Sequence, residues 1–328
     1  MAAKNGISAS VIPYGACLQS VQIPGRGEIT LNFDSLDGYL ARHPFFGVTV
    51  GRVANRIAGA EFELDGTVYA LEKIQGDAHL HGGSGGFHRR LWDWKVVEEG
   101  DGAAVRFFRR SVDNEEGYPG NLDVTVTIGL SATGVLRFAY EAECDAATIV
   151  NLTNHTYWKL DDRPTILDHE LQLFADRYLE VGEDLIPTGR ILPADGPMDF
   201  SVPHTVGERI SSVPGGYDHC YVLPESEIGA AAKLDAGPVP ELRQIAALKP
   251  HDLSIRMEVW TSSPAVQFYS GNMLPNSPEI LGRKFAIHQA MCLETQFFFF
   301  FVHHPAFPPI VLRPGEKFRH ATEHRFYL

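Results

Sequence analysis

The stretch VNLTNHTYWKL, from Val150 to Leu160, is the part of the sequence that decides the fold. Its alternation of side chains is typical of a β-strand. One face carries three apolar and two polar side chains: Val150, Leu152, Asn154, Thr156 and Trp158. The other face carries only side chains that form hydrogen bonds: Asn151, Thr153, His155 and Tyr157. A half-exposed antiparallel strand explains this polar row, and so does a strand that recognises a ligand rich in hydroxyl groups. Trp158 is expected in the core.

Most of the chain divides into short runs with strand periodicity, separated by many of its 31 glycines and 21 prolines. Apolar residues alternate with polar ones over residues 124–130 and 136–142, on either side of a turn at Ala132 to Gly134. This pattern predicts a β-hairpin. Residues 255–259 and 266–268, which flank Ser263-Pro264, predict two further strands.

Helical signals are scarce. The strongest comprises Leu242, Ile245 and Leu248, three residues apart and followed by Pro250, and it predicts a short helix. The alanine- and glycine-rich segment from Glu225 to Pro238 is expected to be an excursion on the surface.

The whole chain, residues 1–328, is interpreted as one domain because no charged linker, composition shift or exact repeat divides it. Many short strands joined by turns predict an all-β fold, a large antiparallel β-sandwich. Seven or nine strands do not account for 328 residues, so the sheets are expected to be unusually large.

The composition restricts the possible partners. With 41 acidic and 28 basic residues the formal charge is −13, which argues against nucleic acid and anionic membranes and favours a neutral small molecule. The four cysteines are far apart and form no zinc or disulfide pattern, which favours a reducing compartment. We expect a cytoplasmic protein because the sequence shows no apolar signal core and no long apolar run.

Two motifs are rejected as catalytic sites. Ser84 in GGSGG, residues 82–86, matches a nucleophile elbow, but no helical pattern follows it, so a glycine turn explains it better. His303 and His304 are adjacent, so on a strand they point to opposite faces and would rarely bind one metal.

Four polar residues lie where strands give way to glycine. His81 precedes a glycine turn, Asn55 and Arg56 precede Gly59, and Asp218 follows Gly216. The histidine, His81, can reach from such a strand end into a shared cleft. Each of the four residues also has a simpler explanation, as a structural histidine, a solvated charge or a turn aspartate.

Glu294 in MCLETQ is the sharpest candidate. It shares a strand face with Cys292 and Gln296, and the apolar run from Phe297 to Phe301 follows directly. Such surroundings would desolvate the carboxylate and raise its proton affinity toward that of a general base. A glutamate on an edge strand in water fits the composition equally well.

Together these fragments resemble the aldose 1-epimerase (galactose mutarotase) family. The matching motifs occur in the family's order from Gly51 to Glu316: GRVANRIAGAEFELDG, HLHGGSGGFHRRLWDW, NLTNHTYWKL, GGYDHCYVL, VQFYSGN and CLETQ with FPPIVLRPGE. The resemblance implies a large antiparallel supersandwich. It also implies an isomerase that interconverts the α and β anomers of free aldohexoses such as galactose and glucose, without cofactor or metal.

The resemblance assigns roles to seven residues. Glu294 is the implied base and His155 the implied acid, and His81 assists near the ring oxygen. The sugar hydroxyls are bound by the remaining four: Asn55, Arg56, Asp218 and Gln267. A monosaccharide is the expected partner, and the chain is expected to act as a monomer or a homodimer.

Three other functions compete with this one. A sugar-phosphate epimerase would need basic residues at the pocket, and Arg89-Arg90 is the only nearby pair. A non-catalytic carbohydrate-binding protein could lose Glu294 or His155. A glycoside hydrolase would need two carboxyl groups, and only Glu294 and Asp218 qualify.

The run from Phe297 to Phe301 departs from the family pattern, which has a polar loop at this place. Alternation puts Phe297, Phe299 and Phe301 on one face of a strand. We expect most of the run to be core and at most one ring to line the pocket.

Overall fold

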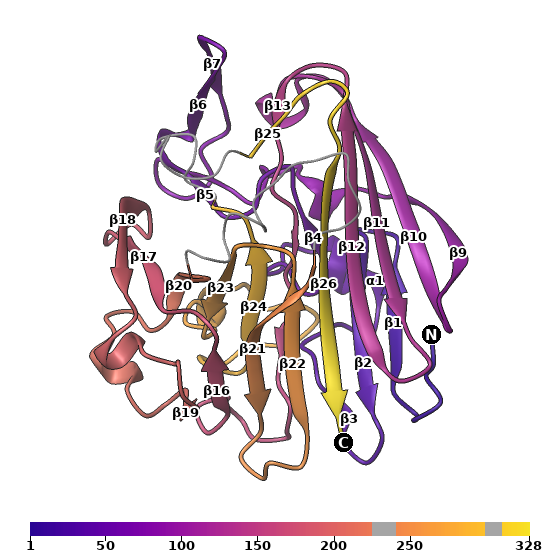
Figure 1. Cartoon of the computed structure of the whole chain (residues 1–328), viewed down its shortest axis with the longest axis vertical. Helices are drawn as coiled ribbons and strands as arrows, with labels where there is room; N and C mark the ends of the chain where they lie inside the picture. The colour runs from indigo at the N-terminus through magenta and orange to yellow at the C-terminus, as the bar shows by residue number, and fades with distance from the viewer. Residues whose placement is uncertain (225–240, 299–309) are drawn as a thin grey trace.

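The computed structural model describes residues 1–224, 241–298 and 310–328. Over these residues the chain is almost entirely β-structure, with one α-helix, α1 (Leu36–Leu40), and several 3₁₀ turns (Figure 1). No described helix is long and apolar enough to span a membrane. The all-β class and the large antiparallel sheets predicted from the sequence are confirmed.

Two large sheets contain most of the strands. The larger has nine strands, in the order β19 (His204–Thr205), β16 (Glu170–Leu173), β21 (Arg243–Lys249), β22 (Arg256–Thr261), β26 (Phe318–Tyr327), β12 (Val135–Cys144), β11 (Leu122–Leu130), β10 (Gly102–Ser111) and β9 (Asp93–Glu99). The other has six, in the order β15 (Tyr157–Trp158), β24 (Met291–Gln296), β23 (Ala265–Tyr269), β20 (Asp218–Val222), β17 (Arg177–Val181) and β18 (Pro187–Pro193).

Smaller sheets complete the fold. One has three strands: β1 (Ser8–Ile12), β2 (Cys17–Ile23) and β3 (Gly27–Glu28). Four are pairs: β13 (Thr148–Ile149) with β25 (Val311–Leu312), β14 (Thr153–Asn154) with β4 (Thr49–Val50), β5 (Arg56–Ile57) with β8 (His79–Leu80), and β6 (Glu61–Leu64) with β7 (Thr67–Ala70). The β6–β7 hairpin projects at the top of Figure 1.

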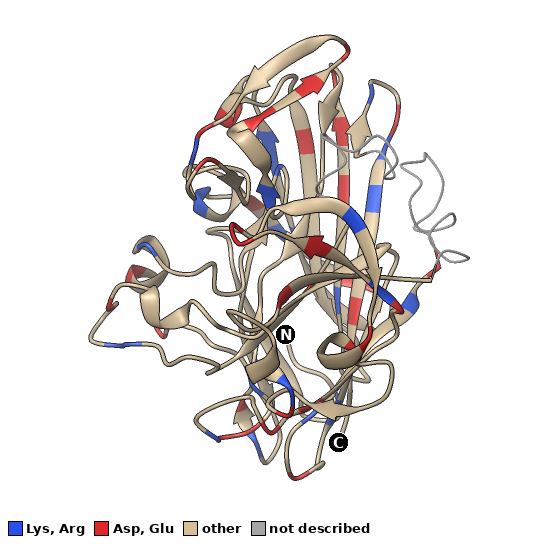
Figure 2. Cartoon of the chain, turned by 90° about the vertical axis from the view of Figure 1, so that its left-hand side faces the viewer, with Lys and Arg blue, Asp and Glu red and all other residues tan. Residues whose placement is uncertain are grey.

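The predicted hairpin is β11–β12, paired in register from Leu122 opposite Cys144 to Leu130 opposite Leu136. The two later strand predictions are confirmed as β22 and β23. Figure 2 shows acidic and basic residues interspersed along the ribbon.

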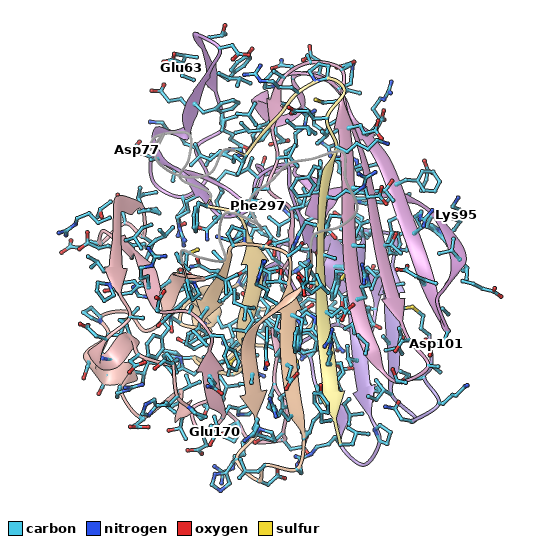
Figure 3. All side chains as sticks on the ribbon, viewed as in Figure 1. Glu63, Asp77, Lys95, Asp101, Glu170 and Phe297 are labelled. Carbon is cyan, nitrogen blue, oxygen red and sulfur yellow. The ribbon has the colours of Figure 1, made fainter. Side chains whose placement is uncertain are left out.

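The core lies between the two large sheets. On β24 the side chains of Leu293 and Thr295 point inward, and the Thr295 hydroxyl lies 2.5 Å from that of Thr322 on β26. Phe297, which is labelled in Figure 3, is buried and packs against Phe318 of β26, with ring centroids 5.8 Å apart. Because side chains alternate along a strand, the neighbours of the inward residues, among them Glu294, face away from this core.

The predicted helix after residue 240 is wrong, because this segment is strand β21. Ile245 to Leu248 are all buried inside the nine-stranded sheet, and the register against β22 shifts between Gln244 and Ala246. A strand buried on both faces shows a continuous apolar run, from which a three-residue spacing is easily selected. The excursion expected over residues 225–238 lies outside the described residues.

The alternation in Val150–Leu160 predicts one continuous strand, and this prediction is wrong. The stretch breaks into β14, which pairs with β4, and β15, which pairs with β24. Trp158 is core, as expected. The polar row does not share one surface: the Asn151 side chain accepts from the backbone N–H of Phe297 at 3.0 Å and donates to its carbonyl at 3.1 Å. Asn151 therefore ties this stretch to the end of β24.

Phe297 and Phe298 are both buried, as most of the phenylalanine run is expected to be. Phe299 to Phe301 lie outside the described residues, as do His303 and His304.

Two buried histidines on β26 differ in their partners. The ring of His320 lies within hydrogen-bond distance of the hydroxyls of Ser262 and Ser263, at 3.0 and 3.1 Å. The ring of His324 packs on Trp158, with centroids 4.7 Å apart, and neither of its nitrogens has a partner among the described residues. Burial lowers the pKa of each histidine to about 3.

These histidines predict acid sensitivity. An unfolded histidine titrates near pH 6.5, so below that pH the unfolded chain binds protons that the folded chain excludes. The free energy of unfolding should therefore fall as the pH decreases from about 6.5 toward about 3. Replacing His324 by Phe should keep or raise the Tm at pH 7, because no hydrogen bond is lost. It should also make the decrease in Tm between pH 7 and pH 5 smaller, because Phe does not titrate.

The matched control is His320→Phe, which should lower the Tm at pH 7 because two buried serine hydroxyls lose the ring as a partner. Thermal denaturation at both pH values measures the effect. Equal losses in the two variants would contradict this account.

Candidate active site

A cavity of about 140 Å³ lies on the outer face of the six-stranded sheet. It brings together all seven residues singled out from the sequence: Asn55, Arg56, His81, His155, Asp218, Gln267 and Glu294. Pockets for drug-sized ligands have volumes of about 300–1,000 Å³. This smaller cavity therefore suits one small molecule.

The sheet register builds the floor of this cavity. Glu294 on β24 is the direct neighbour of Gln267 on β23, so their side chains emerge on the same face. Asp218 is the first residue of β20, the next strand, and its Cα partner on β23 is Tyr269. Because β24 is a strand over Met291–Gln296, the prediction that Glu294 shares a strand face with Cys292 and Gln296 is confirmed.

Two loops from the first quarter of the chain form the opposite wall. Arg56 pairs with Leu80 in the short β5–β8 ladder, which places Asn55 beside His81. The chain after His81 also packs closely against Gly51, which requires glycine at position 82. The φ of Gly82 is +82°, and a Cβ there would lie 1.8 Å from the carbonyl oxygen of Gly51. Only glycine fits a left-handed backbone in such close contact.

Asp218 is held by two donors. The Arg56 guanidinium lies 3.3 Å from its Oδ2, and the Gln267 amide donates to its Oδ1 at 2.7 Å. Arg56 also donates to Gln75 at 2.8 Å. The Gln267 carbonyl oxygen is buried and has no hydrogen-bond partner among the described residues. Such a group is a ready acceptor for a ligand hydroxyl.

Glu294 is 3% exposed. Burial, followed by repulsion from Asp218, raises the pKa of its carboxyl well above 4.5, while the Arg56 cation partly opposes this shift. Its Oε2 is buried and has no partner in the described part of the chain. The carboxylate therefore combines high proton affinity with a free acceptor oxygen, as a general base requires.

Two neutral imidazoles face this carboxylate. Burial lowers the pKa of His155 to about 3. Burial, followed by the proximity of His155 and Arg56, lowers the pKa of His81 well below 6.5. Nε2 of His155 lies 3.6 Å from Oε1 of Glu294. Nδ1 of His81 accepts from the backbone N–H of Asn55 at 3.1 Å, so the proton of His81 is on Nε2.

Comparison with known proteins places the chain in a family. The profile of the aldose 1-epimerase family matches residues 1–325. The chain belongs to the aldose 1-epimerase family. It is an isomerase that interconverts the α and β anomers of aldoses.

Individual relatives agree with this assignment. Galactose mutarotase of Rattus norvegicus is 40% identical over 330 residues, which cover 98% of this chain and 91% of the relative. Aldose 1-epimerase of Escherichia coli K12 is 33% identical over 334 residues, with coverage of 98% and 92%. The crystal structure of an aldose epimerase homologue from C. elegans superposes with a TM-score of 0.86 at 27% identity, covering 100% of this chain and 97% of the other.

Several residues that line this cavity were given no role from the sequence. Phe45 lines the cavity and lies over His155, with ring centroids 5.5 Å apart and an interplanar angle of 21°. Gln75 and Tyr269 also line it. Phe45 and Gln75 also border a larger outer cavity of about 530 Å³, and Ser84 lines only that outer cavity, as part of a turn.

One group of described residues has the geometry to hold a metal ion: His81, His155 and Glu294, with ligand atoms within 4.8 Å of one another. Metal binding requires an imidazole lone pair. The only lone pair of neutral His81 is on Nδ1 and accepts the Asn55 N–H. The donor set therefore fits a metal poorly, and it fits a ligand that accepts one hydrogen bond and donates another.

Replacing Gly82 by Ala should damage both the fold and the site. A left-handed non-glycine residue costs roughly 1–2 kcal/mol, and here the Cβ would also clash with Gly51. Gly66→Ala is the matched control, because Gly66 has a φ of +79° and open space around it. Thermal denaturation should show a clearly larger loss for Gly82→Ala. A loss equal to that of Gly66→Ala would contradict the close approach.

Proposed function

We propose that Glu294 is the general base and His155 the general acid of aldose anomer interconversion, acting on free aldohexoses such as galactose and glucose. The observation that supports this most strongly is the buried Glu294 carboxylate, which has one oxygen without a partner among the described residues and the other 3.6 Å from Nε2 of His155. His81 offers a second N–H donor to the same cavity.

The reaction needs two proton transfers. Glu294 takes the proton of the anomeric hydroxyl, the bond between the anomeric carbon and the ring oxygen breaks, and His155 gives its Nε2 proton to the ring oxygen. Rotation about the exposed carbon–carbon bond presents the other face of the aldehyde, and reversal of both transfers closes the ring as the other anomer. Positioned acid–base groups contribute about 10²–10⁴-fold each.

A neutral imidazole can serve as the acid in this site. When Nε2 gives up its proton, negative charge grows on His155 while Glu294 becomes neutral. Because the two groups are 3.6 Å apart, the proton held by Glu294 lies beside the nitrogen that lost one. The pair as a whole therefore develops little extra charge in a dry environment, where separated charge is costly.

The remaining residues bind hydroxyls. Asp218, Arg56, Gln267 and Asn55 form a connected set of donors and acceptors suited to a neutral sugar. A phosphorylated sugar has less support as the substrate. Arg89 donates to the carbonyls of Leu40 and Ala41, at 3.5 and 3.4 Å, which leaves it less suited to a phosphate.

Glycoside hydrolysis and simple carbohydrate binding are also less well supported. Both oxygens of Asp218 are engaged by Arg56 and Gln267, so Asp218 is a poor second acid for a glycoside hydrolase. A protein that only binds carbohydrate would not need a carboxylate of raised proton affinity. The single domain, the monosaccharide partner, the monomeric or homodimeric state and the cytoplasmic location stay predictions.

Glu294→Gln should leave the protein folded and remove at least about 10²-fold of the rate, since an amide has the shape of the carboxylate but accepts no proton. Polarimetry of α-galactose and α-glucose measures the rate. Glu258→Gln, at a buried carboxylate on β22, is the matched control and should stay active. Near-normal acceleration by Glu294→Gln would remove this residue from the role.

His155→Asn should still bind sugar while kcat falls steeply, because the cavity keeps its other contacts but loses the proton donor. His169→Asn, at another buried histidine, is the control. Calorimetric titration and polarimetry separate binding from turnover. If affinity and rate declined in proportion, His155 would be a binding residue and not the acid.

A further inference from the structure

The thiol of Cys292 lies beside Nδ1 of His155, the ring nitrogen that does not face Glu294. Cys292 is fully buried on β24, two residues before Glu294 and on the same face. Its register partner across the sheet is Tyr157 on β15. Its Sγ lies 3.4 Å from Nδ1 of His155. Proton transfer by His155 uses its Nε2 and does not involve this contact at Nδ1.

The Cys292 thiol keeps the proton that it needs to act as a hydrogen-bond donor. Burial raises the pKa values of both the Cys292 thiol and the Tyr157 hydroxyl well above their ordinary ones, so both keep their protons. The protonated thiol therefore has an S–H to donate, and Nδ1 of His155, 3.4 Å from Sγ, is within its reach as an acceptor.

The ring plane of His155 is fixed separately. The imidazole lies between the rings of Phe45 and Tyr157, stacked on each with centroids 5.5 and 5.0 Å away. Its backbone N–H donates to Val48 at 3.0 Å, and its carbonyl accepts from Gly47 at 3.0 Å. Stacking and backbone bonds orient the ring, but they do not decide which nitrogen carries the proton.

We propose that Cys292 is a positioning residue that holds His155 in the tautomer with its proton on Nε2, facing Glu294. A neutral imidazole has one N–H, and the hydrogen bond made by one nitrogen decides the state of the other. A donor at Nδ1 therefore places the proton on Nε2. The Asn55 N–H does the same for His81, so a thiol and a backbone amide give both imidazoles the same tautomer.

This inference rests on the proposed role of His155 and extends it. In the other tautomer Nε2 would carry a lone pair toward the Glu294 carboxylate and would have no proton for the ring oxygen. The S–H donor also stabilises the negative charge that grows on the ring as Nε2 loses its proton. Cys292 itself exchanges no proton with the sugar and forms no covalent bond.

Nitrogen-15 NMR of histidine-labelled protein tests the tautomer directly, with the His155 signals assigned by their absence in His155→Asn. The wild type should show a protonated Nε2 and an unprotonated Nδ1. In Cys292→Ala and Cys292→Val the Nδ1-protonated form should appear, and kcat should fall about tenfold with KM nearly unchanged. Cys292→Ser, which keeps an O–H donor, should restore the tautomer and most of kcat.

The control is Cys144→Ala. Cys144 is the last residue of β12, and its thiol donates to the Leu312 carbonyl at 3.4 Å, away from His155. This variant should leave tautomer and kcat unchanged. If Cys292→Ala does not fold, the Val and Ser variants still decide, because both fill the space and only Ser donates. An unchanged tautomer in Cys292→Val would overturn the proposal even if kcat fell. Full activity of His155→Asn would instead overturn the role of His155.

Discussion

The structure depends on the alternation of side chains along β24. Leu293 and Thr295 point into the core between the two large sheets, and this burial fixes the register of the strand. The same register places Cys292 and Glu294 on the outer face, under the loops that bear Asn55 and His81. A shift by one residue would exchange the two faces, burying a carboxylate in the core and presenting a leucine to the sugar.

The connections between the segments follow from this constraint. Asn151 binds both backbone groups of Phe297 with its side chain, while its own backbone N–H donates to Arg52 at 2.9 Å and its carbonyl accepts from Ala54 at 2.8 Å. One fully buried residue thereby joins the segments that carry Glu294, His155 and Asn55. Orientation of reacting groups at this level is a major source of enzymatic rate acceleration.

Much of this was predictable from the sequence, and the failures have physical causes. Six of the seven residues that the cavity unites stood out from the residues alone: four beside glycine turns, Glu294 in MCLETQ, and His155 in the polar row of the Val150–Leu160 stretch. The family resemblance supplied the seventh, Gln267. The Val150–Leu160 stretch was misjudged because alternation does not reveal where a strand breaks, and its Asn151 bonds to backbone far along the chain. Strand β21 resembled a helix because it is buried on both faces. Phe45 had no signal, since its position over His155 depends on tertiary structure alone.

The role of Glu294 as a base depends on the raised proton affinity that burial gives its carboxylate. Infrared difference spectroscopy over a pH titration tests it most directly, with the carbonyl stretch of the protonated carboxyl assigned by comparison with Glu294→Gln. We expect Glu294 in the sugar-free protein to become protonated at a pH well above 4.5. Protonation at or below that value would contradict it.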